Sequence, residues 1–239
     1  MRDTRPPGDL RVESAHRGCP DDDTCWDRRQ AKHAKPWLVD QSGPVAVLRG
    51  PAQPFTLAST IPVSWTGSDT GSGVASYQVR WTRAPFNGGF AAWRYPAAWQ
   101  KVTGINVTFS ATAPGYTHCF QVRGVDKLGN VGACSTVNCA AAPIDDRSMG
   151  ASSGWTRSTS SVFYRGTATV TTKAGVYLSR TGAALSRVAI VATRCPTCGS
   201  VGMYVNNVAV GTVSLYSAKL QYRAVIALPA TLTAAALWW

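Results

Sequence analysis

The feature that most restricts the fold of this chain is an alternation of apolar and polar residues in short segments. From residue 51 onward such segments are separated by turn residues, and none shows the 3.6-residue period of a helix. Four of them lie around Val63, Val79, Val107 and Phe120. Because successive side chains of a strand point to opposite faces, each segment predicts a half-buried strand. Strands this short, with turns every eight to twelve residues, indicate an all-β fold built from antiparallel β-sandwiches.

Composition and pattern divide the chain into four parts. Residues 1–50 mix charges, Pro and Gly without a period, so we expect them to be mostly disordered. Residues 51–142 predict one sandwich, residues 143–153 a linker, and residues 154–239 a second sandwich. Segments 201–205 and 208–213 predict a hairpin closed by Asn206 and Asn207, because Asn tolerates the left-handed backbone of a type I′ turn. After Pro229 no further alternating strand follows, so we expect the second sandwich to be incomplete at its C-terminal end.

Two stretches of the first sandwich resemble a known family. They are VSWTGSDTGSGVASYQVRW at residues 63–81 and HCFQVRGVDKLGNVG at residues 118–132. Both are similar to a fibronectin type III or bacterial immunoglobulin-like module, and the likeness covers residues 51–142. His118 departs from the pattern, since the family places a corner Tyr there. In the second block, Gly154-Trp155 followed by the segment at 164–166 resembles the jelly-roll, galactose-binding-like tail modules of exported bacterial proteins. These resemblances imply extracellular modules of the kind attached to secreted hydrolases.

Groups that catalyse reactions are scarce. Residues 51–239 contain four carboxylates, Asp69, Asp126, Asp145 and Asp146, and one histidine, His118. Asp69 and Asp126 lie in predicted turns, where Asp commonly accepts hydrogen bonds from its own backbone, and the other two are adjacent in the linker. His118 occupies a strand position, and no base with an orienting partner is evident for a nucleophile. We therefore expect no enzymatic activity and no cofactor.

Cysteine spacing predicts a first disulfide. Cys119 and Cys139 each lie ten residues from Gly129, so a symmetric hairpin places them opposite each other, at a separation close to what a bridge needs. The same register places Cys134 opposite Gly124 on the other face, where a small thiol fills space.

A second pair, Cys195 and Cys198, connects the end of one predicted strand to the start of the next. Without a helix N-terminus to lower a thiol pKa, a disulfide that staples the loop is favoured over a free dithiol or half of a metal site. Near the N-terminus, Cys19 and Cys25 enclose three Asp residues, but this spacing fits no common metal site. We therefore expect no metal.

Aromatic and basic residues gather in a Pro- and Gly-rich stretch between strands. Trp93, Tyr95 and Trp99, with Arg83 and Arg94, are the candidate ligand-binding residues, because flat rings stack on sugar faces and guanidinium groups contact acidic polymers. The alternative is that these rings form a lid over the core.

The charge of the chain is unequally distributed. Of a net charge of +12, residues 51–239 contribute +11, from fifteen basic and four acidic side chains. Such a surface attracts polyanions, but the basic residues are dispersed, which argues against a specific nucleic-acid site. The chain contains no apolar run of eighteen residues, so the sequence predicts no transmembrane helix. The first residues do not have the pattern expected of a signal peptide. Seven cysteines favour an oxidising, extracellular compartment or a cell surface.

Together these features predict non-catalytic binding modules that adhere to carbohydrate, a cell-wall polymer or another polyanionic surface. Two other functions remain open at this point. The modules could be accessory domains of a secreted hydrolase that cleaves polysaccharide or peptide, or they could be a spacer without a ligand.

Overall fold

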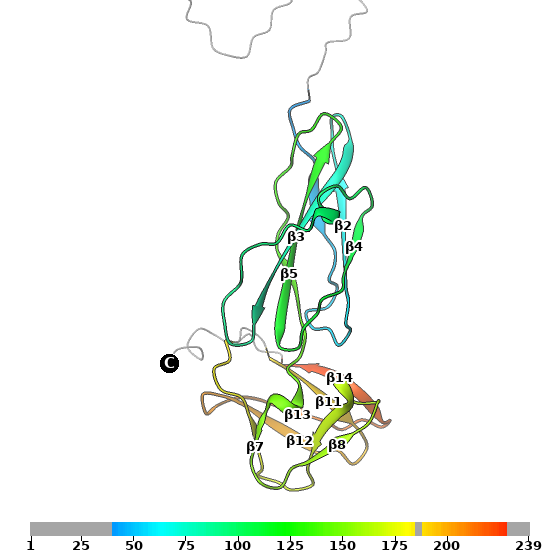
Figure 1. Ribbon diagram of the computed structural model, residues 1–239. Coiled ribbons are helices and arrows are strands. Elements are labelled where there is room, and N and C mark those ends of the chain that lie inside the picture. Colours follow the sequence, from blue (N-terminus) through cyan, green and yellow to red (C-terminus); the bar gives the residue numbers. More distant parts are fainter. Residues whose placement is uncertain (1–39, 185–187, 229–239) are drawn as a thin grey trace, which may run out of the picture. The chain divides into compact units, whose positions relative to one another are not determined.

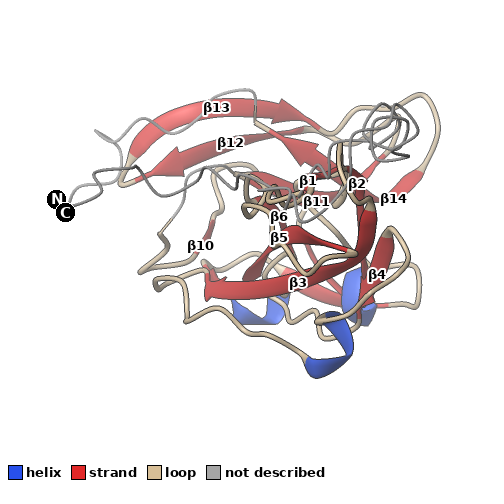
Figure 2. Cartoon of the chain, turned by 90° about the horizontal axis from the view of Figure 1, so that it is seen from above, coloured by secondary structure: helices blue, strands red, loops and turns tan. Residues whose placement is uncertain are grey.

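The computed structural model describes residues 40–184 and 188–228, and within them the chain is all-β, as the alternation predicted (Figure 1). The helical segments of this part are three single 3₁₀ turns, η1 (Ala97–Trp99), η2 (Asp146–Ser148) and η3 (Tyr164–Gly166) (Figure 2). None of the described helices has the length and apolar character needed to cross a membrane. The expectations for residues 1–39, including Cys19 and Cys25, and for the end of the chain from residue 229 lie outside the described residues.

Two three-stranded antiparallel sheets form the first sandwich. One contains β1 (Val45–Leu48), β2 (Ile61–Ser68) and β4 (Asn106–Phe109) in the order β1-β2-β4. The other contains β3 (Val74–Pro85), β5 (Tyr116–Asp126) and β6 (Asn138–Ala141) in the order β3-β5-β6 (Figure 2). The chain crosses from one sheet to the other between β2 and β3, between β3 and β4 and between β4 and β5, which is typical of immunoglobulin-like sandwiches. The first sandwich therefore has a fibronectin type III or immunoglobulin-like fold.

The core of this sandwich consists of the apolar positions of the predicted alternation. Val63 of β2 and Phe120 of β5 are completely buried, and Val79 and Val122 are 1% exposed. Trp65 packs edge-on against a ring of the other sheet, that of Tyr77, with 5.5 Å between ring centroids. Burial of a Val or Phe side chain contributes about 1.5 to 3 kcal/mol, so these positions determine the register of both sheets.

Residues 40–50, which we expected to be poorly ordered, instead contribute strand β1. Ala46 and Leu48 are buried, whereas Val45 and Val47 are exposed, and β1 pairs with the whole second half of β2. The expectation was wrong because four alternating residues are too few to stand out beside a charged segment. β1 is held by its pairing with β2 and by the shared core.

The second block, residues 143–228, contains four two-stranded antiparallel sheets, which are β7–β10, β8–β9, β11–β14 and β12–β13. Its eight strands are β7 (Gly150–Ala151), β8 (Thr156–Thr159), β9 (Thr167–Val170), β10 (Leu178–Ser179), β11 (Ala189–Arg194), β12 (Ser200–Val205), β13 (Val208–Ser214) and β14 (Gln221–Ala227). The predicted hairpin is confirmed: β12 and β13 pair, and Asn206 and Asn207 have φ angles of 50° and 63° (Figure 2). The expected linker itself contains η2 and β7.

The described part of this block has little core. Val213 is its one buried apolar residue, whereas the first sandwich contains all the others. A jelly-roll arrangement of these small sheets remains a prediction.

Candidate functional site

A repeated tripeptide organises the outward-facing surface of the β3–β5 pair. Gln-Val-Arg occurs at residues 78–80 of β3 and again at residues 121–123 of β5. The strands are antiparallel and pair Val79 with Val122, so each Arg stands opposite the Gln of the other strand. Because the two Val side chains are buried, the Arg and Gln side chains point outward.

Both Arg–Gln pairs form hydrogen bonds. Arg80 donates from Nε and Nη2 to Gln121 Oε1, at 3.0 and 2.6 Å, and Arg123 donates from Nε to Gln78 Oε1 at 2.7 Å. In each pair the acceptor is a neutral amide. The hydrogen bonds therefore fix the guanidinium groups without cancelling their charge.

Two of the predicted aromatic residues join this surface. The Arg80 guanidinium lies 4.6 Å from the centroid of the Trp93 ring and 5.9 Å from that of Tyr95. Arg80 also donates from Nη1 to the Tyr95 hydroxyl at 2.9 Å. We call this surface the outer face, and its residues are Gln78, Arg80, Trp93, Tyr95, Gln121 and Arg123.

The other three predicted ligand residues lie elsewhere. The Arg94 guanidinium lies 5.3 Å from the centroid of the Trp81 ring, and Trp81, which alternates with Arg80, points to the other side of β3. Arg83 lies over a ring of β5, and Trp99 packs against the core, with its ring centroid 6.4 Å from that of Phe109. Of the five candidates, Trp93 and Tyr95 thus lie together, whereas the other three contact different rings, and Trp99 has the packing position that the lid alternative described.

A small hollow of about 50 Å³ opens on the outer face. Its lining includes both Arg–Gln pairs, Tyr95 and Cys134. Cys134 is an exposed free thiol, so the expectation that it fills space opposite Gly124 was wrong. The pairing of β5 with β6 ends at Asn138, and closer to the turn the backbone of Gly132, not Cys134, bonds to Gly124.

The carboxylates of the first sandwich are all at one end. Residues 40–142 contain seven basic side chains and three acidic ones, Asp40, Asp69 and Asp126. Oxygen atoms of these three carboxylates lie within 4.8 Å of one another. All the ion pairs found among the described residues lie in the second block, and they join Asp145 to Arg147 and Arg165, and Asp146 to Arg157. No described carboxylate therefore neutralises the arginines of the outer face.

Backbone donors account for the acidic cluster. Asp69 accepts from the N–H groups of Gly71 and Gly73, and Asp126 accepts from those of Leu128 and Asn130, as the turn interpretation predicted. Asp40 accepts from Ser72 and Ser42, and these bonds hold the pKa of Asp40 far below its ordinary value. Three convergent carboxylates are groups that can hold a cation, but here their hydrogen bonds explain the geometry without one.

His118 is a core residue. Its side chain is completely buried, its ring centroid lies 4.9 Å from that of Phe109, and neither ring nitrogen has a hydrogen bond of good geometry within the described residues. Burial and the positive charge of Arg83 lower the pKa of His118 to about 4, against the opposing effect of the Ala111 backbone. A neutral, enclosed imidazole without a carboxylate partner does not have the geometry of a general base in a catalytic triad.

Asp145 and Asp146 are structural rather than free groups. Arg147 donates to Asp145 from its side chain and its backbone, which lowers the pKa of Asp145 to about 2. Asp146 accepts hydrogen bonds from the hydroxyl groups of Thr167 and Thr169. Asp146 thus fastens the start of the second block to strand β9.

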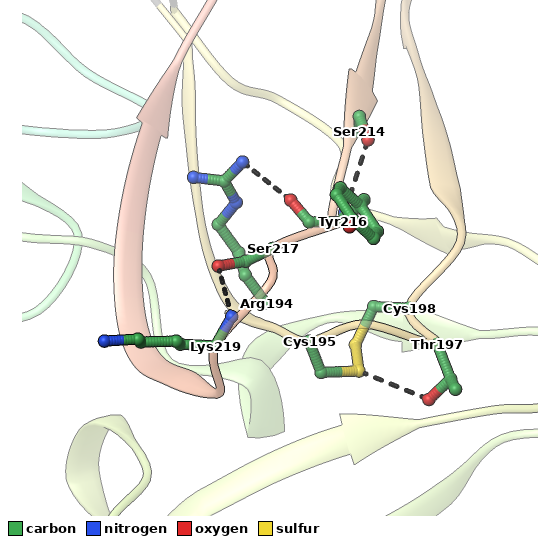
Figure 3. The surroundings of a disulfide bond; sticks show 8 residues. All are labelled: Arg194, Cys195, Thr197, Cys198, Ser214, Tyr216, Ser217 and Lys219. Carbon is green, nitrogen blue, oxygen red and sulfur yellow. Dashed lines mark hydrogen bonds between the residues drawn. A yellow bond between two sulfur atoms is a disulfide. The ribbon is translucent and has the colours of Figure 1, made fainter.

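Both predicted disulfides are present. Cys119 and Cys139 are directly paired between β5 and β6, with 4.1 Å between their Cα atoms. Cys195 and Cys198 are bonded across the loop after β11, beside Arg194 and Tyr216 (Figure 3). Cys195 follows a strand, so the helix dipole that activates a thioredoxin-type thiol is missing there, and the bond staples the loop.

The second block has a more open hollow of about 330 Å³, lined by residues 154–156 and 170–173. Trp155 lies in its lining and donates from Nε1 to the backbone carbonyl of Tyr177 at 3.1 Å. This is the Gly-Trp segment that resembles the opening of jelly-roll tail modules.

Comparison with known proteins gives no family assignment. No protein-family model matches the chain, and no curated protein sequence matches it. Among solved structures, it is similar to an Fn3-like protein from Clostridium thermocellum, at 22% identity over 43% of this chain and 90% of that one, with a TM-score of 0.27. The twitchin kinase region from C. elegans matches at 15% identity over 48% of this chain and 19% of that chain, with a TM-score of 0.29.

A structure described as a myokine matches at 13% identity, over 44% of this chain and 99% of that one, with a TM-score of 0.30. The assignment of the first sandwich rests on its own strand order and not on these alignments.

Sequence reasoning missed Arg80, Arg123 and their Gln partners. The signal was nevertheless present, because an identical Gln-Val-Arg tripeptide in two antiparallel strands that meet at Val places each Arg beside a Gln. Prediction of the two Arg–Gln pairs required only that β3 and β5 be paired in this register.

Proposed function

We propose that this chain is a non-catalytic extracellular binding protein whose outer face holds an acidic carbohydrate polymer, such as an acidic polysaccharide or a cell-wall polymer. The observation that carries the proposal is the charge of the outer face. Arg80 and Arg123 are held by amides, and the carboxylates of their sandwich are gathered at one end. A polymer that brings its own anionic groups supplies the missing counter-charges.

The aromatic residues favour a carbohydrate over a nucleic acid. Arg80 covers one face of Trp93, which reduces the ring area on which the bases of a nucleic acid can stack. Tyr95 is 54% exposed and lies at the rim, where its ring edge and hydroxyl meet a polymer chain that passes over the strands. Polar donors beside a flat ring are typical of a surface that contacts sugars.

The two disulfides support an extracellular location, since such bonds form and persist in oxidising compartments. The same face would serve an accessory domain that keeps a secreted hydrolase close to its polymer.

Retention on immobilised polymers tests the proposal. We expect the full chain to bind polygalacturonate and dextran sulfate but not neutral dextran, and binding to weaken as salt rises from about 0.05 to about 0.5 M, because exposed charges are screened over about 10 Å at 0.1 M. Tyr95→Ala should weaken binding several-fold.

The matched control is Tyr177→Ala, which removes another exposed Tyr and should leave retention unchanged. Equal retention on neutral dextran, or no retention on either acidic polymer, contradicts the proposal, and the second result favours a spacer.

A further inference from the structure

We infer that the hollow between the two Arg–Gln pairs is a subsite for one oxyanion of the ligand, a carboxylate or a sulfate group carried by the polymer. The inference rests on the proposed function, but it names a particular group of atoms and can fail separately.

The size of the hollow sets the size of its occupant. A water molecule needs roughly 10 to 15 Å³ of such space, so a hollow of about 50 Å³ holds roughly four waters. That space fits one carboxylate or sulfate group and excludes a whole sugar ring. The ring that carries the anionic group therefore remains outside, at the level of Tyr95.

Arg123 has more free donors than Arg80. Arg80 already donates from all three of its nitrogens, to Gln121 and to Tyr95. Arg123 is only half-buried, and it donates from Nε to Gln78, while its two Nη atoms have no acceptor among the described residues. A guanidinium group held at one side by Nε presents its other donors as a fork, which is the arrangement that recognises an oxyanion through two hydrogen bonds.

The two arginines thus have different roles in binding the oxyanion. Arg123 forms the direct bonds to the oxyanion, and Arg80 contributes positive charge from the opposite side of the hollow. Gln78 is a positioning residue, because its amide oxygen orients Arg123. A carboxylate at residue 78 would accept the same hydrogen bond but would also neutralise Arg123.

Gln78→Glu is therefore the sharpest variant. It preserves the size of the side chain and its hydrogen bond, so the fold is retained, but it places a competing anion on the subsite. We expect the Kd for both polygalacturonate and dextran sulfate to rise by at least about tenfold, which is the loss of affinity expected when one charge-assisted hydrogen-bonded contact is removed. The control is Gln53→Glu, which makes the same charge change at an exposed loop position and should change Kd by less than about twofold.

Arg123→Lys separates a subsite from general charge. The charge is unchanged, but the fork is lost, so we expect Kd to rise by about three- to tenfold. The control Arg49→Lys should have no effect. The acidic polymer that shows the larger loss with Gln78→Glu identifies the oxyanion as carboxylate or sulfate.

Cys134 gives an independent readout, since its thiol lines the hollow. Bound polymer should slow its alkylation by a neutral maleimide, measured at peptide level by mass spectrometry. Failure of the unaltered protein to bind either polymer removes both the proposed function and the subsite. Binding that is equal in Gln78→Glu and Gln53→Glu, or alkylation that the polymer does not slow, overturns the subsite alone.

Discussion

At the scale of single residues, a side chain with catalytic potential can have a purely structural environment. The sequence identified His118 as the one histidine after residue 50 and as an occupant of a strand position, and the structure places it in the core beside Phe109. The effect of Arg83 on His118 could not be predicted from the sequence. The register of β3 and β5 places Arg83 opposite His118, and the positive charge of Arg83 disfavours protonation of the imidazole. Arg83 lies 35 positions before His118 in the sequence and in another strand, so only the register reveals their contact.

His118 should make stability depend on pH. Its pKa is about 4 in the folded protein, against an ordinary value of 6.5, so between these values the unfolded chain binds a proton that the folded chain does not. The contribution of His118 to stability is therefore complete above about pH 6.5 and is lost as the pH falls toward 4, by on the order of 3 kcal/mol. Urea unfolding at several pH values, compared with His118→Leu, measures this contribution.

In His118→Leu the slope between pH 6.5 and 4 should become shallower. Stability at pH 7 should be equal or higher, because two buried nitrogens without good hydrogen bonds are removed. An identical slope in the two proteins would show that other groups cause the dependence.

At the scale of elements, strands and turns were predicted well where they were long enough to show a period. Strands β2 to β5 were located from alternation, and the β12–β13 turn from its two Asn residues. Strand β1 was missed, because its four residues follow a charged segment and only pairing with β2 makes them a strand. The outer face was half predicted: Trp93 and Tyr95 were identified from composition, but their partner Arg80 depends on strand pairing.

The two disulfides should differ in their contribution to stability. Cys119 and Cys139 are separated by 20 residues and join two strands of one sheet, whereas Cys195 and Cys198 are separated by 3. Because the loss of unfolded-state entropy grows with the loop, replacing the first pair by Ala should cost about 3 kcal/mol and the second about 2 kcal/mol or less. Urea unfolding of the two double variants at pH 7 measures both values. A larger loss for the Cys195–Cys198 pair would refute this ranking.

At the scale of the whole molecule, packing is concentrated in the first sandwich. Apart from Val213, every buried apolar residue of the described chain lies between residues 44 and 142. The second block has many exposed apolar side chains, including Tyr204 at 67% and Leu220 at 55%. The sequence predicted two sandwiches because alternation of apolar and polar residues indicates strands. Alternation does not indicate how many neighbouring strands each strand pairs with or how many side chains pack against it.

Amide hydrogen exchange should reveal this difference. We expect the slowest exchange in β2, β3 and β5, which lie over the core, and faster exchange by at least about tenfold in β8, β9, β12 and β13, because local opening requires less free energy where few apolar contacts are lost. Exchange followed by mass spectrometry on the full chain measures both regions together. Equal protection in the two blocks would contradict the conclusion that the first sandwich is well packed and the second block lightly packed.

The gathering of Asp40, Asp69 and Asp126 at one end of the first sandwich has a consequence for how this module meets its surroundings. These three anions form an acidic tip, whereas Arg80 and Arg123 lie on the flank formed by β3 and β5, so the module has an electric dipole. Near a negatively charged surface a torque acts on this dipole before contact, turning the acidic tip away and the flank inward. The encounter of the module with such a surface would then be oriented as well as accelerated.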